Sequence, residues 1–337
     1  QCYLSNKNTN FEEKKYSILL DSVDIGDIIG VKGEMFYTKT NEYTLRITEF
    51  VILSKGIRPL PNLKEKDGEA FNTFEDKELR YRHRHLDFIA NPERKNIFIK
   101  RHEIINGFRD FLNQNEYIEA ETPVLQPIYG GANARPFTTH HYTLDEKLYL
   151  RIAVELYLKR LIIGGFNKIY EISKNFRNEG MDRNHNPEFT MLEFYQAFSD
   201  YEEMMSLTEE MLESVTRAAT GSSDVTFGKD TISFAPPFRR LSLRETVREA
   251  AEEKVGESVG ESALRVRKEA AALAARLGLE VPSGAAAGKI VLGIFEKLCE
   301  PRLIQPTFVY DFPTEISPLS KQTPGDPETV ERFELYA

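Results

Sequence analysis

Short runs in which apolar and polar residues alternate recur along the chain, and this alternation predicts β-strands with one buried face. Runs at 27–36 and 43–53 flank a polar turn. Two further runs lie within 173–197 and flank a loop rich in charged and hydrogen-bonding side chains. We therefore expect two β-hairpins, an early one and a more polar one near the middle of the chain.

Other segments place apolar residues at helical spacing. The clearest is 96–115, with apolar positions at Ile97, Ile104, Ile105, Phe108, Phe111 and Leu112. Further helices are expected at 154–163, 200–219, 242–254 and 261–277. The first of these should stop at Gly164-Gly165, and Ser242 with Glu245 could form a capping box. Strands mixed with helices and hairpins predict an α+β fold, a mixed and mainly antiparallel sheet flanked by helices.

The amino-acid composition limits the possible fold classes and locations of the protein. The chain has 337 residues, 41% of them hydrophobic, which allows a large core and suggests at least two domains. It contains no apolar run of the roughly 20 residues that a membrane helix needs and no signal pattern at its start, so no membrane is involved and a cytoplasmic location is expected. Cys2 and Cys299 are far apart and are interpreted as ordinary thiols. The net charge of -9 argues against non-specific coating of nucleic acid.

Two regions carry less specific signals. Residues 55–75 contain Pro59, Pro61 and Gly68 among charged residues and are expected to be a linker. The stretch 78–87 is basic and helical, and it could be either a solvated helix face or a hinge that contacts a nucleic-acid backbone. Residues 250–290 turn rich in Ala and Gly, which indicates an inserted helical segment to which we assign no chemistry.

The central hairpin carries the candidate chemistry. Alternate residues of a strand share one face, so Arg177 and Glu179 should point the same way, and Phe189, Met191, Glu193 and Tyr195 should share a face beyond the loop. A guanidinium beside a carboxylate can bind a phosphate and an amine together. The alternative for such a pattern is an edge hairpin with surface salt bridges. His140 and His141 are adjacent on an expected strand and should point to opposite faces, so we interpret them as structural.

The amino-acid sequence of this hairpin is specific for one protein family. Phe176-Arg177-Asn178-Glu179, followed by the run from His185 to Tyr195, resembles motif 2 of the class II aminoacyl-tRNA synthetases, in the form found in the lysyl enzymes. Further sequence motifs of the same family occur at 121–123, 130–137, 149–160 and 303–308. The resemblance therefore covers nearly the whole chain, and it is weakest over 239–300. It implies lysine–tRNA ligase activity, with ATP as co-substrate, Mg²⁺ as cofactor, and L-lysine and tRNA(Lys) as substrates.

The resemblance also implies residue roles. Arg177 is the catalytic arginine that bridges the α-phosphate and the substrate carboxylate. The residues expected to bind ATP are Arg177, Glu179, Arg183, His185, Asn186 and Phe189. Arg183 is the least certain of them, because the family often has a basic residue where this chain has Asn184. The residues expected to bind lysine are Gly131, Glu155, Arg177, Glu193 and Tyr195. For Glu155 the residues alone favour an ordinary surface ion pair with Lys159. Glu334 matches a Mg²⁺ ligand.

Three domains follow from the resemblance. Residues 1–54 are expected to be part of an OB-fold that binds the anticodon through Gln1 and Glu42, 55–75 the linker, and 76–337 an incomplete catalytic domain with motifs 1 and 2 but without motif 3. Motif 1, at about 96–123, implies a homodimer. In the family the sequence continues beyond Ala337, so we expect this chain to be a fragment truncated at both ends with little or no activity alone.

Other assignments remain open at this stage. A lysyl-synthetase paralogue that modifies a translation factor lacks the early β module, so residues 1–53 argue against it. The aspartyl and asparaginyl enzymes share the architecture, yet the phrases at 130–137 and 185–191 favour lysine. The chain could also be a binding module without catalysis, and ATP exchange that depends on an amino acid separates these classes.

Overall fold

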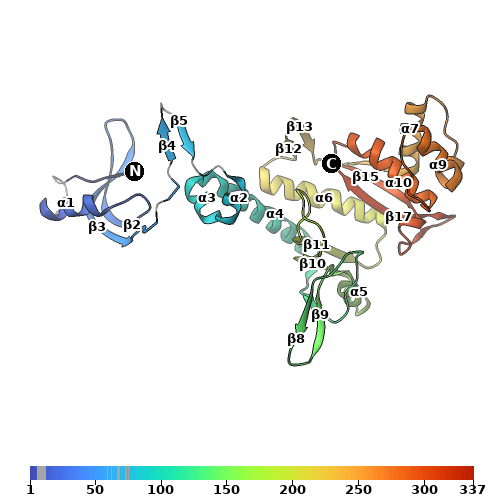
Figure 1. Cartoon of the computed structure of the whole chain (residues 1–337), viewed down its shortest axis with the longest axis horizontal. Coiled ribbons are helices and arrows are strands. Elements are labelled where there is room, and N and C mark those ends of the chain that lie inside the picture. The colour runs from blue at the N-terminus through green and yellow to red at the C-terminus, as the bar shows by residue number, and fades with distance from the viewer. Residues whose placement is uncertain (6–12, 59, 62, 67–68, 73, 75) are drawn as a thin grey trace. The chain divides into compact units, whose positions relative to one another are not determined.

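In the computed structural model of the chain, the described residues are 1–5, 13–58, 60–61, 63–66, 69–72, 74 and 76–337 (Figure 1). They form two compact units, Gln1–Ile99 and Lys100–Ala337, each with its own helices and strands. None of the helices among these residues combines the length and apolar character that crossing a membrane requires.

The first unit is built around a small sheet. Its strand order is β1-β3-β2, with β2 and β3 antiparallel, which confirms the early hairpin. The segment expected to be a linker contains a second antiparallel pair, β4 and β5, while its residues 59, 62, 67–68, 73 and 75 lie outside the described part. The elements are β1 (Cys2–Tyr3), α1 (Glu13–Ser22), β2 (Ile28–Tyr37), β3 (Tyr43–Ser54), β4 (Leu63–Lys66), β5 (Glu69–Asn72), α2 (Lys77–Arg82), α3 (Arg84–Ala90) and η1 (Pro92–Arg94).

The remaining elements carry the central hairpin and the later helices. They are α4 (Lys95–Gln114), β6 (Ile118–Glu119), β7 (Leu125–Gln126), β8 (Thr138–His141), β9 (Glu146–Leu150), α5 (Glu155–Ile163), β10 (Lys168–Phe176), β11 (Glu188–Gln196), α6 (Tyr201–Thr220), β12 (Asp224–Phe227), β13 (Asp230–Ser233), β14 (Arg239–Ser242), α7 (Leu243–Val255), α8 (Ser262–Arg265), α9 (Arg267–Arg276), α10 (Ala287–Leu298), η2 (Glu300–Arg302), β15 (Thr307–Pro313), η3 (Thr314–Ile316), β16 (Gln322–Thr323) and β17 (Asp326–Tyr336).

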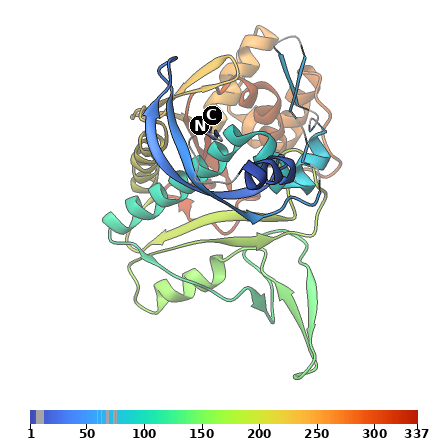
Figure 2. The same cartoon turned by 90° about the vertical axis from the view of Figure 1, so that its left-hand side faces the viewer.

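Helices and mixed, mainly antiparallel strands make the fold α+β, as predicted. Our prediction of a single sheet is wrong, because the described strands form six separate sheets of two to four strands. Two of them matter for the chemistry: β11-β10-β6 and β14-β15-β17-β16. The ribbons of β10 and β11 run side by side, and the β8–β9 hairpin projects beyond them (Figures 1 and 2).

The Ala- and Gly-rich segment packs as a helical layer. Helices α7 and α10 contact β15 (Figure 1), and the core between them includes Leu243, Val291, Ile294, Phe295 and Val309. A second core joins α4 and α6 to β10 through Leu112, Tyr170, Met211 and Val215. Burial of these side chains supplies the main favourable free energy of folding for each layer.

The helix predictions hold with two corrections. The expected helix at 261–277 breaks at Val266, whose extended backbone separates α8 from α9. Ser242 is the residue before α7, but its side chain makes no capping hydrogen bond, so the capping box is wrong. Its carbonyl oxygen instead accepts a hydrogen bond from the Thr246 hydroxyl. Helix α5 ends as predicted, with a positive φ of 106° at Gly165.

Helix α4 has two kinds of apolar residue. Phe111 and Leu112 are buried, whereas Ile97 and Ile104 remain exposed. Ile118, Val124, Leu125 and Ile128, which follow the helix, are exposed as well. The apolar surface of the region 96–123 is therefore only partly covered by this chain.

Candidate active site on strands β10 and β11

Strands β10 and β11 hold the central motif in one register. They pair antiparallel along their whole length, with Glu171 opposite Glu193 and Asn175 opposite Phe189. Directly opposite residues of an antiparallel pair have their side chains on the same face. The predicted hairpin is thus confirmed, and Phe189 and Glu193 share a face with Glu171 and Asn175.

The prediction for Arg177 and Glu179 is wrong in its reasoning, because β10 ends at Phe176 and both residues follow the strand. The Arg177 N–H still donates to the Pro187 carbonyl at 2.8 Å, which closes the end of the hairpin. The next N–H, that of Asn178, donates to the Arg135 carbonyl at 2.7 Å. After Arg177 the backbone therefore stops pairing with β11 and bonds to the 130–137 segment instead. The alternation of side chains along a strand no longer determines the direction of the Glu179 side chain.

Arg177 is half-buried and is held by weak contacts. Its guanidinium carbon lies 5.2 Å from the centre of the Phe189 ring, a cation–π contact, and its Nε donates to the Ile152 carbonyl at 3.4 Å. Within the described residues we find no carboxylate paired with it. The cation is consequently available to an anionic ligand.

The carboxylates of Glu193, Glu155 and Glu171 lie near one another. The Tyr195 hydroxyl donates to Glu193 Oε2 at 2.8 Å. Burial raises the pKa of Glu193, the Tyr195 hydroxyl and the Val154 N–H oppose that rise, and the nearby carboxylates of Glu155 and Glu171 raise the pKa further. Glu171 and Glu155 have cationic partners in Arg151 and Lys159, whereas Glu193 has none among the described residues, so Glu193 is the carboxylate that favours a cationic ligand.

Gly131 adjoins this acidic cluster. Its φ of +87° favours glycine, and a Cβ built on it would lie 3.1 Å from the Glu155 Cβ and 3.2 Å from the Ala153 Cβ. The structure therefore brings Gly131 and Glu155 together, as expected for two residues of one pocket. Glu155 also pairs with Lys159 at 2.5 Å, the surface ion pair that the sequence alone favoured.

The sequence analysis missed three residues that support the site, Arg151, Glu171 and Asn175. Arg151 and Glu171 form a buried ion pair, 2.6 Å between Nη1 and Oε1, and the Thr122 hydroxyl donates to Glu171 Oε2 at 2.6 Å. The phrases at 121–123 and 149–160 contain Thr122 and Arg151, but nothing in the sequence shows that Glu171 joins them. Asn175 is fully buried, and neither amide atom has a hydrogen-bond partner.

The loop between the strands is exposed. Glu179, Arg183, His185 and Asn186 all lie on it. The Glu179 N–H donates to the Arg177 carbonyl at 3.0 Å, but within the described part of the chain none of the four side chains has a hydrogen bond or ion pair with Arg177. The His185 ring instead contacts the carboxylate of Asp182 at 2.8 Å, which with the N–H groups of 184 and 185 lowers the pKa of Asp182. The structure therefore does not assemble the expected phosphate contacts by itself.

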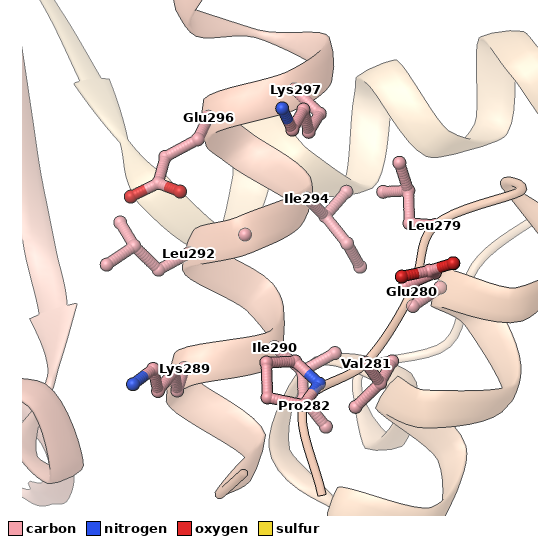
Figure 3. A pocket seen from close by; sticks show the side chains of 12 residues that line it. Leu279, Glu280, Val281, Pro282, Lys289, Ile290, Leu292, Ile294, Glu296 and Lys297 are labelled. Carbon is pink, nitrogen blue, oxygen red and sulfur yellow. The ribbon is translucent and has the colours of Figure 1, made fainter.

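A hollow of about 550 Å³ opens beside this loop. It joins the loop to the 130–137 phrase, and its lining residues are Tyr129, Asn133, Ala134, Arg135, Pro136, Asn178, Glu179 and Gly180. Two sequence phrases that lie about forty residues apart thus meet at one surface. A second cavity, of about 320 Å³, lies between α10 and the 279–282 segment and contains none of the predicted site residues (Figure 3).

Glu334 lies on β17, and its carboxylate is already engaged. It pairs with Arg332 and accepts a hydrogen bond from the Tyr336 hydroxyl at 2.7 Å. In the part of the chain that the structure describes, no group of three or more His, Cys, Asp or Glu side chains could hold a metal ion. These residues alone do not make a preformed Mg²⁺ site, which needs about six oxygen ligands. The rings of His140 and His141 have separate partners, Asp145 and the Leu144 N–H.

In the first unit, the two expected anticodon residues meet at Thr44. The buried Thr44 hydroxyl donates to Gln1 Oε1 at 3.1 Å and to the Glu42 carbonyl at 3.2 Å. The Glu42 side chain stays exposed. Thr44 thus links the Gln1 side chain to the backbone of Glu42.

Comparison with known proteins agrees with this geometry. The model of the family "tRNA synthetases class II (D, K and N)" matches residues 76–337. A lysine–tRNA ligase of Christiangramia forsetii is 48% identical over 97% of this chain and 57% of its own length. Lysine–tRNA ligases of Porphyromonas gingivalis (48% identical) and Syntrophomonas wolfei (47%) match 96% of this chain and 55% and 63% of their own lengths. The chain spans between about half and two thirds of these relatives, and it belongs to the class II tRNA synthetases of the D, K and N group.

Proposed function

We propose that the protein activates L-lysine with ATP and transfers it to tRNA(Lys). The observation that carries this proposal is an arginine without a carboxylate partner that stacks on the Phe189 ring, together with Glu193, a carboxylate without a cationic partner on the same strand as that ring. An amino acid with two ammonium groups and one carboxylate complements that distribution of charge. Aspartate would bring a second carboxylate toward Glu155, Glu171 and Glu193, so the electrostatics favour lysine over an acidic substrate.

The proposed chemistry has two steps. A carboxylate oxygen of lysine attacks the α-phosphorus of ATP in line, the bond to the bridging oxygen breaks, and pyrophosphate leaves with lysyl-adenylate formed. A terminal ribose hydroxyl of the tRNA then attacks the lysyl carbonyl, and AMP leaves. Neither step needs a side-chain nucleophile, so the chain contributes positioning and charge.

Each residue has a role in this scheme. Arg177 neutralises charge on the α-phosphate and orients the lysine carboxylate, while Phe189 offers its ring to the adenine. Glu155 and Gly131 hold the α-ammonium, and Glu193 with Tyr195 lines the pocket for the ε-ammonium. Glu179 reads the adenine amino group. Arg183, His185 and Asn186 lie on the exposed loop, which we propose folds over the ATP phosphates when they bind.

Mg²⁺ is proposed as the cofactor that enters with ATP. Bound there, the ion would neutralise charge on the phosphates. Glu334 would offer one carboxylate to the ion, in exchange for its present pairing with Arg332.

The other parts of the chain have proposed partners too. Residues 1–54 would be part of an OB-fold that receives anticodon bases at Gln1 and Glu42, 55–75 a linker, and 76–337 the catalytic domain. The exposed apolar residues of 96–123 support a homodimer interface there. Cytoplasmic location is proposed as well.

Amino-acid-dependent ATP–pyrophosphate exchange tests the proposal. The assay compares lysine with aspartate and asparagine, using the 337-residue chain and the same chain joined to the C-terminal remainder of one of its relatives. We expect lysine alone to drive exchange in the longer protein, with little turnover by the chain itself. Exchange that aspartate drives would contradict the proposal. A folded longer protein in which none of the three amino acids drives exchange would contradict it as well.

A further inference from the structure

A buried amide group of β10 has no hydrogen-bond partner. Asn175 is fully buried, and among the described residues neither its Oδ1 nor its Nδ2 makes a hydrogen bond. An asparagine amide carries two N–H donors and an acceptor oxygen, and a group of this kind that is buried and unpaired destabilises the fold. Because most buried polar groups of native proteins are paired, an exception of this kind is a candidate for function.

Asn175 lies on the face of the hairpin that carries the candidate active site. It is directly opposite Phe189 in the register of β10 and β11, so the two side chains share one face. Ile169, on the same face of β10, packs against Val154, and the Val154 N–H hydrogen-bonds to Glu193. The unpaired amide is therefore on the same side of the sheet as the carboxylate proposed to bind lysine.

The arginine two residues after Asn175 also lacks a strong partner. The Arg177 guanidinium stacks on the Phe189 ring at 5.2 Å, and its Nε donates to the Ile152 carbonyl at 3.4 Å, which is a long hydrogen bond. A guanidinium has five N–H donors, so within the described residues most donors of Arg177 remain unused. Asn175 and Arg177 are thus neighbours of one aromatic ring, the first with an unused acceptor and the second with unused donors.

We propose that Asn175 is a positioning residue that orients Arg177 when the adenylate binds. The adenine is proposed to stack on the Phe189 ring, which the guanidinium occupies in the free chain, so the two compete for that ring. Once displaced, Arg177 donates an N–H to Asn175 Oδ1, and this hydrogen bond holds the guanidinium toward the α-phosphate. The inference rests on the proposed function for its ligand and adds a residue to it that acts through Arg177.

A double-mutant cycle tests this inference. Calorimetry measures the binding of ATP and of a non-hydrolysable lysyl-adenylate analogue to the 337-residue chain, to Asn175→Leu, to Arg177→Met and to the double variant. We expect Asn175→Leu to bind each ligand at least about tenfold more weakly than the wild type, the effect of one hydrogen bond to a charged group. In the Arg177→Met background the same substitution should change the affinity less than about twofold, because no guanidinium is left to orient.

The stability of the free chain separates positioning from a structural role. Asn175→Leu removes an unpaired buried amide, so its melting temperature should equal or exceed that of the wild type. Asn115→Leu is the matched control, because the Asn115 amide donates to the Phe111 carbonyl at 2.9 Å. This control should melt at a lower temperature and bind both ligands as the wild type does. An Asn175→Leu variant that melts lower and binds with unchanged affinity would show a structural role and overturn the inference.

The remaining outcomes distinguish the inference from the proposed function. Equal losses of affinity from Asn175→Leu in both backgrounds would overturn the inference alone. A wild type that binds ATP but not the lysyl analogue would contradict the proposed function, and the cycle with ATP would still decide the role of Asn175. Binding of neither ligand would overturn both. If the leucine variant does not fold, the smaller Asn175→Ala replaces it in the same cycle.

Discussion

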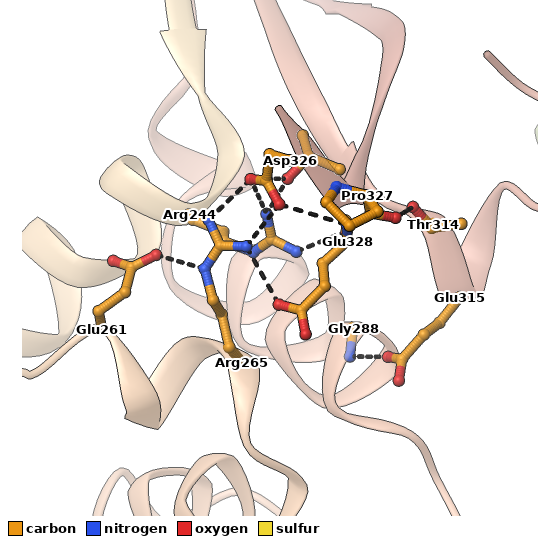
Figure 4. A network of polar contacts seen from close by, with 10 residues as sticks. Arg244, Glu261, Arg265, Gly288, Thr314, Glu315, Asp326, Pro327 and Glu328 are labelled. Carbon is orange, nitrogen blue, oxygen red and sulfur yellow. Dashed lines mark hydrogen bonds and ion pairs between the residues drawn. The ribbon is translucent and has the colours of Figure 1, made fainter. Parts of the chain in front are cut away.

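Two polar clusters of the second unit use the same residue types with opposite results. In the candidate active site, Arg177 has no carboxylate partner and Glu193 has no cationic partner among the described residues. In the other cluster, Arg265 binds Asp326 with two parallel hydrogen bonds of 2.9 and 2.8 Å and Glu261 with a third of 2.6 Å (Figure 4). The comparison teaches that matched charges stabilise the fold, whereas unmatched charges mark a place for a ligand.

The pKa shifts follow the same division. Hydrogen bonds from Arg265 lower the pKa of Asp326, so its ionised form stabilises the folded chain. Burial and neighbouring carboxylates raise the pKa of Glu193, so its ionised form destabilises the folded chain. A partly buried carboxyl group whose ionised form costs stability is a candidate for function.

The largest effect is expected from Arg177→Gln on activity. In the chain joined to the C-terminal remainder of a relative, loss of a preorganised charge aimed at the reacting phosphate should reduce lysine-dependent exchange by about 10²–10³-fold, while the melting temperature changes little because the arginine has no ion pair to lose. The matched control is Arg160→Gln, which removes an exposed arginine stacked on Tyr157 at 5.0 Å. Equal losses in both variants would break the comparison.

Arg265→Leu should have the opposite profile. It leaves Asp326 and Glu261 without their partner, and we expect a loss of about 2–3 kcal/mol in the free energy of unfolding, measured in urea. Since the lowered pKa of Asp326 stabilises only while that carboxyl is ionised, the difference should shrink as the pH falls through the folded-state pKa. A variant as stable as the wild type would show that the matched network contributes nothing.

Asp200 and Ser242 extend the comparison to helix starts. The Asp200 side chain accepts from the N–H groups of Glu202 and Glu203, so Asp200→Ala should cost about 1 kcal/mol of stability. Ser242 makes no such bond, and Ser242→Ala should cost less than about 0.5 kcal/mol. Denaturant titrations measure both, and equal costs would argue that the cap bonds are not the cause.

The smallest expected effect is that of Glu193→Gln on the pH dependence of stability. Below both pKa values the carboxyl is protonated in the folded and unfolded chain, and the variant should match the wild type. As the pH rises, the unfolded chain loses its proton first, so the wild type loses stability that the glutamine variant keeps. The variant should therefore have a higher melting temperature than the wild type at pH 8 and the same melting temperature at pH 4. A variant with a lower melting temperature than the wild type at pH 8 would contradict this.

Local patterns predicted the central hairpin well, because alternation over nine residues fixes which side chains share a face. Alternation could not show that β10 ends at Phe176, since that end depends on the Asn178 N–H bonding to Arg135, more than forty residues away. The segment 250–290, to which we assigned no chemistry from its composition, supplies Arg265, and its partner Asp326 lies 61 residues later. Pairings across such distances follow from tertiary packing and leave no periodic signal.

Binding of a non-hydrolysable lysyl-adenylate analogue to the 337-residue chain tests the central claim most directly. Calorimetry on the wild type, Arg177→Gln and Glu193→Gln should show binding by the wild type and at least about tenfold weaker binding by each variant, a change of about 1.4 kcal/mol. Each of these charges lacks a matching partner in the chain, so the ligand should supply it. Equal affinity in all three, or tighter binding of the aspartyl analogue by the wild type, would contradict the account.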